Sequence, residues 1–173
     1  MHIPAATRAE FERLLQEHGG IIYKVAYGYA RGESDRRDLM QEIALQLWRA
    51  FPHYTPGRPF STWMYRIALN VSISFLRKQR RTDHNTVELD EAQHEPMQES
   101  SNTPEMEERI ALLHQIIAKS APLDRALLLL YLDDCSYREI ASVLGLTETN
   151  VATKLSRLKE RIRQELTTKH DQQ

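Results

Sequence analysis

Two groups of side chains in this sequence have the types and the spacing that contact nucleic acid. The first lies on FSTWMYRIALNVSISFLRKQRR, residues 60–81, where Trp63, Arg66 and Asn70 recur at steps of three and four and share one face of a helix. A ring can stack on a base, a guanidinium can hold a phosphate, and an amide can bond a base edge. The segment ends in a basic cluster suited to a phosphate backbone, Arg77, Lys78, Arg80 and Arg81. The alternative is that Trp63 belongs to the core and the cluster only complements a helix end.

The second group lies on SYREIASVLGLTETNVATKLSRLKERI, residues 136–162, which reads as two short helices joined by a tight turn. Short polar residues early in the second helix can reach base edges, and the cations that follow can pair with phosphates. The residues expected to face solvent there are Thr149, Asn150, Thr153, Lys154 and Arg157. Lys159 and Arg161 are expected to join Lys154 and Arg157 as phosphate contacts. An ordinary packed helical hairpin remains the alternative.

Local signals define the helices that must position this second group. Ser136 with Glu139 three residues later forms a capping box, Gly145 suits a left-handed turn, and Thr147 can cap the last helix. Pro122 can open the helix before them. The apolar positions expected to face inward on the last helix are Val151, Leu155, Leu158 and Ile162. A further stripe is formed by Met106, Ile110, Leu113 and Ile117. With the small Ala141 between the helices, this spacing predicts a helix-turn-helix.

The N-terminal part predicts four helices. The first two are marked by Phe11, Leu14 and Leu15, and by Ile21, Ile22, Val25, Ala26 and Tyr29. Ser34 can cap the third, whose buried stripe is Leu39, Ile43, Leu47 and Phe51. Prolines and a glycine between Pro52 and Pro59 then predict a defined loop. The fourth helix, with Ser61 or Thr62 near its cap, turns Met64, Ile67, Ala68, Val71 and Phe75 inward.

A polar face on the third helix is left over once its buried stripe is assigned. Its members are Asp38, Gln41, Glu42 and Arg49. Such a face is usually only solvated, and binding to a partner is the second interpretation.

Charge is segregated along the 173 residues although the formal net charge is only -1. Residues 1–81 contain 13 basic and 7 acidic residues, and residues 109–173 contain 10 basic and 8 acidic residues. Residues 82–108 between them contain 9 acidic residues and no basic ones. Two positive pieces therefore flank an acidic segment, which reads as an extended flexible linker or as a plain solubilising spacer. We expect an all-α protein of two small helical domains, 1–81 and 105–173, joined by this acidic linker at 82–104, with the helix-turn-helix in the second.

Compartment and chemistry follow from what the sequence lacks. A single cysteine, Cys135, excludes an internal disulfide, and it is read as a small residue rather than a redox group. The N-terminus has no signal-peptide core, and the longest apolar run, 126–132, is far shorter than the roughly 20 residues that cross a bilayer. We expect a cytoplasmic chain with no membrane insertion, no enzymatic activity, no cofactor and no metal.

The order of these motifs resembles the extracytoplasmic-function (ECF) sigma factors, small initiation factors that direct bacterial core RNA polymerase to particular promoters. The resemblance runs from about Glu10 to Leu166. It rests on DLMQEIALQLWRAF, then the Pro/Gly loop, then PFSTWMYRIALNVSISFLRKQRR, followed by an acidic linker and the helix-turn-helix.

The resemblance implies roles for particular residues. Those implied to dock on core polymerase are Asp38, Leu39, Gln41 and Glu42. Those implied to melt and hold the downstream promoter element (the −10 element) lie on the loop from Pro52 to Ser61 and beyond it, namely Phe60, Trp63, Arg66, Asn70, Arg77, Lys78, Arg80 and Arg81. Those implied to read the upstream element (the −35 element) are Thr149, Asn150, Thr153, Lys154 and Arg157. The family also implies that the linker enters the polymerase channels and that an anti-sigma factor regulates the chain, although no residue here indicates the latter.

Two departures and two competing interpretations stay open. Ala152 and Ser156 stand where many family members have Lys and His or Arg, so the preferred upstream sequence is not assigned. A stand-alone helix-turn-helix regulator would bind duplex DNA without polymerase. A helical-bundle metalloprotein would use the Glu-x-x-His spacing of EAQH, Glu91 to His94, which has no second copy in the sequence.

Overall fold

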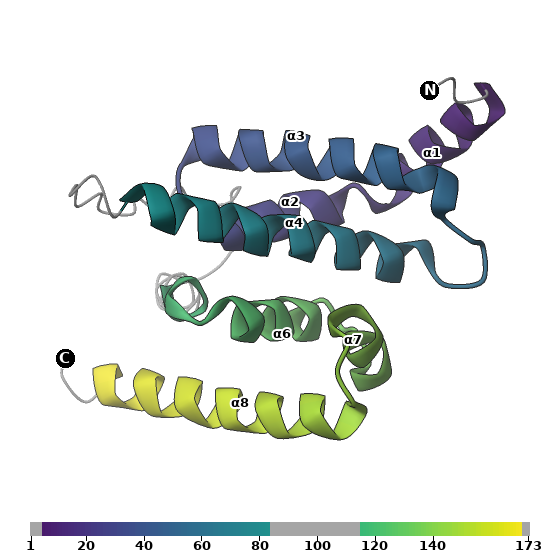
Figure 1. The fold of residues 1–173 in the computed structure, drawn as a ribbon. Helices are drawn as coiled ribbons and strands as arrows, with labels where there is room; N and C mark the ends of the chain where they lie inside the picture. The colour runs from purple at the N-terminus through teal and green to yellow at the C-terminus, as the bar shows by residue number, and fades with distance from the viewer. Residues whose placement is uncertain (1–4, 84–114, 171–173) are drawn as a thin grey trace, which may run out of the picture. The chain divides into compact units, whose positions relative to one another are not determined.

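The computed structural model describes residues 5–83 and 115–170, which fall in two compact units (Figure 1). The first unit contains α1 (Ala5–His18), α2 (Gly20–Tyr29), α3 (Glu33–Ala50), the short 3-10 helix η1 (Phe51–His53) and α4 (Phe60–Asp83). The second contains α6 (Pro122–Leu132), α7 (Tyr137–Leu144) and α8 (Glu148–His170). Within those described ranges every regular element is a helix. The expectation of an all-α protein of two helical units is confirmed.

The core of the first unit forms where α2, α3 and α4 pack on one another. The predicted stripe of α3 is buried as expected, with Leu39, Ile43 and Leu47 fully inaccessible. From α2 the predicted residues Ile21, Ile22, Val25, Ala26 and Tyr29 are all buried against it. The apolar periodicity of these helices therefore reports their packed faces correctly.

The inward face of α4 is rotated relative to the prediction. Met64 and Ala68 are fully buried, but Ile67, Val71 and Phe75 are only partly covered. The buried arc continues instead through Tyr65, Leu69 and Ser72. Both α2 and α3 pack on α4, so a wider arc is covered than one stripe predicts. Ser72 is tolerated there because its hydroxyl donates to the Ala68 carbonyl oxygen at 2.8 Å.

The predicted start of α3 is wrong by two residues, whereas the predicted start of α4 at Phe60 is confirmed. The N-cap of α3 is Gly32, with φ of 79°, and α3 begins at Glu33, so Ser34 lies inside its first turn. A glycine adopts this backbone conformation without steric cost. The first turn of α4 closes on Pro59, whose carbonyl accepts from the Trp63 N–H at 3.3 Å. Ser61 and Thr62 therefore lie within α4 and do not cap it.

The local signals of the second unit are confirmed. Pro122 occupies the first turn of α6, and Gly145 ends α7 with φ of 69°. The Thr147 hydroxyl accepts from the Asn150 backbone N–H at 3.2 Å. The inward face of α8 is Val151, Leu155 and Leu158, with Ile162 partly covered. Ile117 is buried, and the first two residues of the predicted linker, 82 and 83, end α4. The rest of the linker with the Glu91–His94 motif, and Met106, Ile110 and Leu113, lie outside the described residues.

The capping box at the start of α7 predicts a pH-dependent contribution to stability. Glu139 accepts hydrogen bonds from the Ser136 hydroxyl at 2.6 Å and from its backbone N–H at 2.8 Å. These bonds, the hydroxyl first, hold the pKa of Glu139 below its ordinary value of 4.5. A depressed folded-state pKa means that the stabilisation is present above that value and is lost as the pH falls through the folded pKa.

We expect Ser136→Ala to lower the free energy of unfolding by about 1 kcal/mol at neutral pH, because a helix cap is lost. Urea unfolding of the full chain from pH 7 to pH 3 measures this. The difference in free energy of unfolding between the variant and the unmodified protein should shrink below about pH 4.5, because protonated Glu139 no longer accepts the charge-assisted hydrogen bond from the Ser136 hydroxyl. A difference that stays constant over this range would exclude the Glu139 contribution.

In the ranges that the structure describes, no helix combines the length and the apolar character needed to span a membrane.

Candidate nucleic-acid interface

The exposed edge of α8 carries the residues predicted to meet base edges and phosphates. Thr149, Asn150, Thr153 and Arg157 are exposed, and Lys154 is half-buried. The Thr153 hydroxyl donates to the Thr149 carbonyl at 2.9 Å, so towards a base it can act only as an acceptor. Asn150 keeps its side-chain amide for an outside partner, since its cap bond uses only the backbone N–H. The geometry is that of a capped helix-turn-helix whose last helix exposes short polar and cationic side chains.

The other two predicted phosphate contacts, Lys159 and Arg161, both make contacts with α6. The Lys159 ammonium lies 4.0 Å from the centroid of the Tyr131 ring. The interaction with Tyr131 is the main reason that the pKa of Lys159 is raised. Because this contact is internal to the unit, Lys159 ties α8 to α6.

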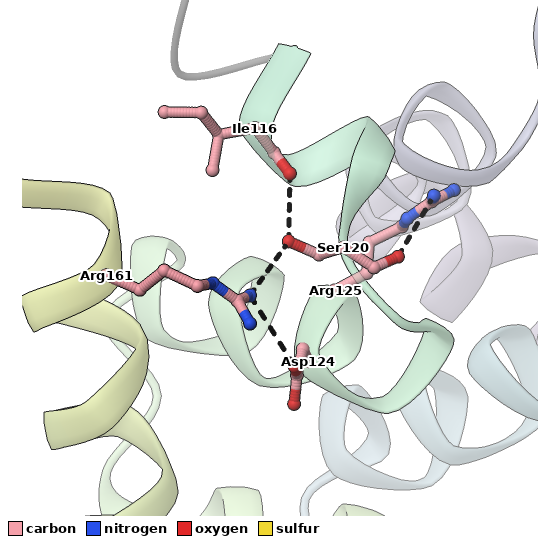
Figure 2. A network of polar contacts seen from close by, with 5 residues as sticks. All are labelled: Ile116, Ser120, Asp124, Arg125 and Arg161. Carbon is pink, nitrogen blue, oxygen red and sulfur yellow. Dashed lines mark hydrogen bonds and ion pairs between the residues drawn. The ribbon is translucent and has the colours of Figure 1, made fainter. Parts of the chain in front are cut away.

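Arg161 makes the corresponding link at the other end of α6 (Figure 2). Its guanidinium lies 3.6 Å from the Asp124 carboxylate and 3.5 Å from the Ser120 hydroxyl, which donates to the Ile116 carbonyl at 2.8 Å. Beside it the buried Arg125 donates to the Ala118 and Ser120 carbonyls and so satisfies the end of the preceding helical turn. This network links α8 to the start of α6 and to the helical turn before it.

We expect Arg161→Ala and Arg157→Ala to separate positioning from phosphate contact. Arg161→Ala should lower the free energy of unfolding by about 0.5–1 kcal/mol, as partly exposed ion pairs do, and leave the salt dependence of DNA binding unchanged. Arg157→Ala should leave stability unchanged and reduce the slope of log affinity against log salt by about 1. Urea unfolding and binding titrations at several salt concentrations measure both. A reduced slope for Arg161→Ala would show that this side chain reaches the backbone after all.

The exposed edge of α4 carries the first predicted group. Arg66, Asn70, Arg77 and Lys78 are exposed along it, and Trp63 is half-buried. Trp63 packs on the neighbouring rings of Phe51, Tyr54 and Phe60 and still presents surface, so its contact with a base stays a prediction. Arg80 and Arg81 lie in the last turns of α4, and their side chains are outside the described residues.

Phe60 corrects the prediction for the downstream group, because its side chain is only 6% exposed. It is surrounded by rings: Trp63 at 5.2 Å, Tyr54 at 5.4 Å and His18 at 5.5 Å between centroids. Phe51 connects this cluster to Phe11 at 5.0 Å. Phe60 thus packs under the rings of Tyr54 and Trp63 as part of the core, and its own ring cannot contact a base.

The exposed edge of α3 holds the predicted polymerase-facing residues, with one correction. Asp38, Gln41 and Glu42 are exposed, and the Glu42 carboxylate accepts from the Gln46 amide at 2.7 Å. Leu39 is 0% exposed, so its side chain belongs to the core and cannot contact a partner. It lies on the buried face of α3 with Ile43 and Leu47.

Leu45 is a surface residue that the sequence analysis missed. It is 41% exposed and lies three residues after Glu42 and seven after Asp38, hence on the same edge of α3. It adds one apolar side chain to an otherwise polar edge of the helix. The signal was present in the sequence, since Leu45 falls outside the buried stripe of Leu39, Ile43 and Leu47.

Comparisons with known proteins agree with this arrangement. The family model for Sigma-70 region 2 matches residues 14–82, and that for Sigma-70, region 4 matches residues 110–162. The chain is 33% identical to the ECF RNA polymerase sigma-E factor of Escherichia coli over 138 residues, which covers 74% of this chain and 72% of the relative. It is 25% identical to the ECF RNA polymerase sigma factor SigE of Mycolicibacterium smegmatis over 91% of this chain, but spans only 62% of that relative's length.

Solved structures share the fold. The sigma factor RpoE from Bartonella quintana, solved in complex with the anti-sigma factor NepR, superimposes with a TM-score of 0.73 at 19% identity, covering 91% of this chain and 97% of that one. CnrH in complex with the cytosolic domain of CnrY gives a TM-score of 0.67 at 22% identity, covering 93% and 90%. With two sigma regions matched in order and a relative above 30% identity, the chain belongs to the ECF sigma factors, transcription initiation factors that direct RNA polymerase to specific promoters.

Proposed function

We propose that this chain binds core RNA polymerase through the exposed edge of α3, reads the upstream promoter element with α8, and opens the downstream element with α4 and the loop before it. The observation that carries the proposal is the presence in one chain of two nucleic-acid edges of different chemistry. The edge of α8 offers short polar groups and cations suited to a duplex groove. The edge of α4 adds the half-buried Trp63 beside an exposed loop, which suits an unpaired strand.

Division of the work between polymerase and sigma factor follows from the energies involved. Unstacking a base step costs a few kcal/mol, and a shaped pocket for a flipped base offsets part of that cost. The pocket is assigned to the loop from 52 to 59 with Trp63, Arg66 and Asn70, while Arg77, Lys78, Arg80 and Arg81 hold the adjacent backbone. Two weakly basic units bind a promoter tightly only when polymerase holds both and each raises the effective concentration of the other.

Residue assignments within the proposal take account of burial. On α3 the polymerase-facing set is Asp38, Gln41, Glu42 and Leu45, because the side chain of Leu39 is buried. On α8 the upstream set is Thr149, Asn150, Thr153, Lys154 and Arg157. The exposed Ser156 lies on the same helix, three residues after Thr153, and adds a short polar group to this edge.

Regulation and location complete the proposal. Because RpoE was solved with an anti-sigma factor, we assign this chain a comparable inhibitor that covers the α3 edge or the α8 edge. The acidic segment between the units is assigned to the polymerase channels that otherwise hold RNA. A factor with these partners works in the cytoplasm, and the polymerase supplies the chemistry of RNA synthesis.

In vitro transcription tests the proposal directly. Core polymerase is incubated with a library of genomic fragments, with and without the purified chain, and the transcripts are sequenced. We expect a small set of start sites that depend on the chain and share two spaced motifs. Gel shifts with and without core polymerase exclude the stand-alone regulator if duplex binding requires the polymerase. Tight, specific duplex binding by the chain alone, without any start site, would contradict the proposal.

A further inference from the structure

We propose that the hydroxyl of Tyr54 is a positioning group, which holds residues 55–59 in the shape that receives an unpaired base of the downstream element. The inference rests on the proposed function, because it takes this loop as the place where a base is captured. It adds the physical device that keeps the loop ready before DNA arrives.

Tyr54 connects the 3-10 helix before the loop to Arg58 near the end of the loop. Its backbone N–H donates to the Phe51 carbonyl at 2.9 Å, which anchors it to η1. Its hydroxyl donates to the Arg58 carbonyl, also at 2.9 Å, and so closes a ring around the residues between. Inside that ring the Gly57 N–H donates to the Thr55 carbonyl at 2.7 Å. The start and the end of the loop are therefore joined through one side chain.

Burial cannot hold this loop, because residues 55–59 are all exposed. An exposed segment of this length normally samples many backbone conformations, and each ordered residue costs conformational entropy. The two hydrogen bonds within the loop oppose that freedom. A segment already in its binding conformation loses less entropy when a ligand arrives, and so binds it more tightly.

The ring of Tyr54 sets where its hydroxyl lies. The ring packs edge-on against Phe60, with centroids 5.4 Å apart, and tilted against Trp63 at 5.2 Å. Both partners lie in the first turn of α4. Because the rings keep Tyr54 in one orientation, the hydroxyl is aimed at the Arg58 carbonyl. Phenylalanine at this position would keep the ring contacts and lose only the bond to the loop.

The test compares three holoenzymes assembled from core polymerase and the unmodified chain, Tyr54→Phe or Tyr23→Phe. Tyr23→Phe is the matched control, since it makes the same chemical change on the exposed surface of α2. The probes are single-stranded downstream-element oligonucleotides from a promoter that the chain transcribes, each with an abasic site at one position in turn. Competition fluorescence anisotropy gives the loss of affinity that each abasic site causes.

We expect the unmodified chain to lose about tenfold or more in affinity at one position, where the captured base is missing. In Tyr54→Phe the ratio of affinities for the intact and the abasic oligonucleotide should be about three- to tenfold smaller than in the unmodified chain. That factor corresponds to the free energy of one ordinary hydrogen bond. Tyr23→Phe should behave like the unmodified chain. Thermal unfolding should distinguish Tyr54→Phe, whose midpoint falls only by the few degrees that one hydrogen bond contributes, from Tyr54→Leu, which also loses the ring contacts and should unfold at a clearly lower temperature.

Three results would decide against the idea in different ways. A full abasic loss in Tyr54→Phe overturns the role of the hydroxyl and leaves the proposed function intact. An unfolding midpoint for Tyr54→Phe as low as that of Tyr54→Leu makes the hydroxyl a structural group and also overturns it. If the unmodified chain shows no abasic loss at any position, base capture itself fails, and with it the premise of this inference.

Discussion

Glu42→Arg is expected to abolish binding to core RNA polymerase and leave the fold unchanged. Glu42 is exposed on α3, and its hydrogen bond to Gln46 is a surface contact, so its replacement costs little stability. At an interface the same change removes a carboxylate and places a cation against the groups that the carboxylate met, which costs several kcal/mol. We expect an affinity loss of about 100-fold or more, measured by co-purification and by titration with labelled core enzyme.

A matched control makes this result specific to the α3 edge. Glu10→Arg changes the net charge of the chain by the same amount on the exposed surface of α1, and it should bind core polymerase normally. Leu45→Ala should weaken binding by about tenfold without altering the unfolding midpoint, because an exposed apolar anchor is lost. Normal co-purification of Glu42→Arg would remove α3 from the polymerase interface.

Asn150→Ala is expected to reduce transcription from the cognate promoter by about tenfold and to reduce discrimination among upstream sequences. An amide that bonds a base edge contributes roughly 1–3 kcal/mol of sequence preference. The variant should fold at least as well as the unmodified chain, because alanine has a higher helix propensity than asparagine and the cap bond uses the backbone N–H. Transcript levels from promoters with single substitutions in the upstream element measure the change.

A control substitution further along α8 checks the assignment of Asn150 to the groove-facing edge. Arg163→Ala removes a charge from an exposed position of α8 that pairs with Glu160, outside the predicted contact set. Its promoter preference should equal that of the unmodified chain. Equal footprints and transcript levels for Asn150→Ala and Arg163→Ala would mean that α8 presents a different edge to DNA.

Signals that act over a few residues were readable from the sequence. The capping box of Ser136 and Glu139, the left-handed Gly145 and the Thr147 cap each depend on groups at most five residues apart, and the structure confirms them. The stripe of Leu39, Ile43 and Leu47 follows from helical periodicity in the same way. The order of these motifs along the chain sufficed to indicate the family.

Burial of individual positions depended instead on which helices cover one another. Leu39 and Phe60 were assigned to binding surfaces, but they are buried because α2 and α4 pack over the first and an aromatic cluster surrounds the second. Leu45 is exposed for the converse reason, since its edge of α3 faces away from that core. Arg161 meets Asp124 across 37 positions of sequence, a distance over which no local pattern operates. Helix type and caps are local properties of the backbone, whereas exposure, and hence which residues can touch a partner, is a property of the packed helices.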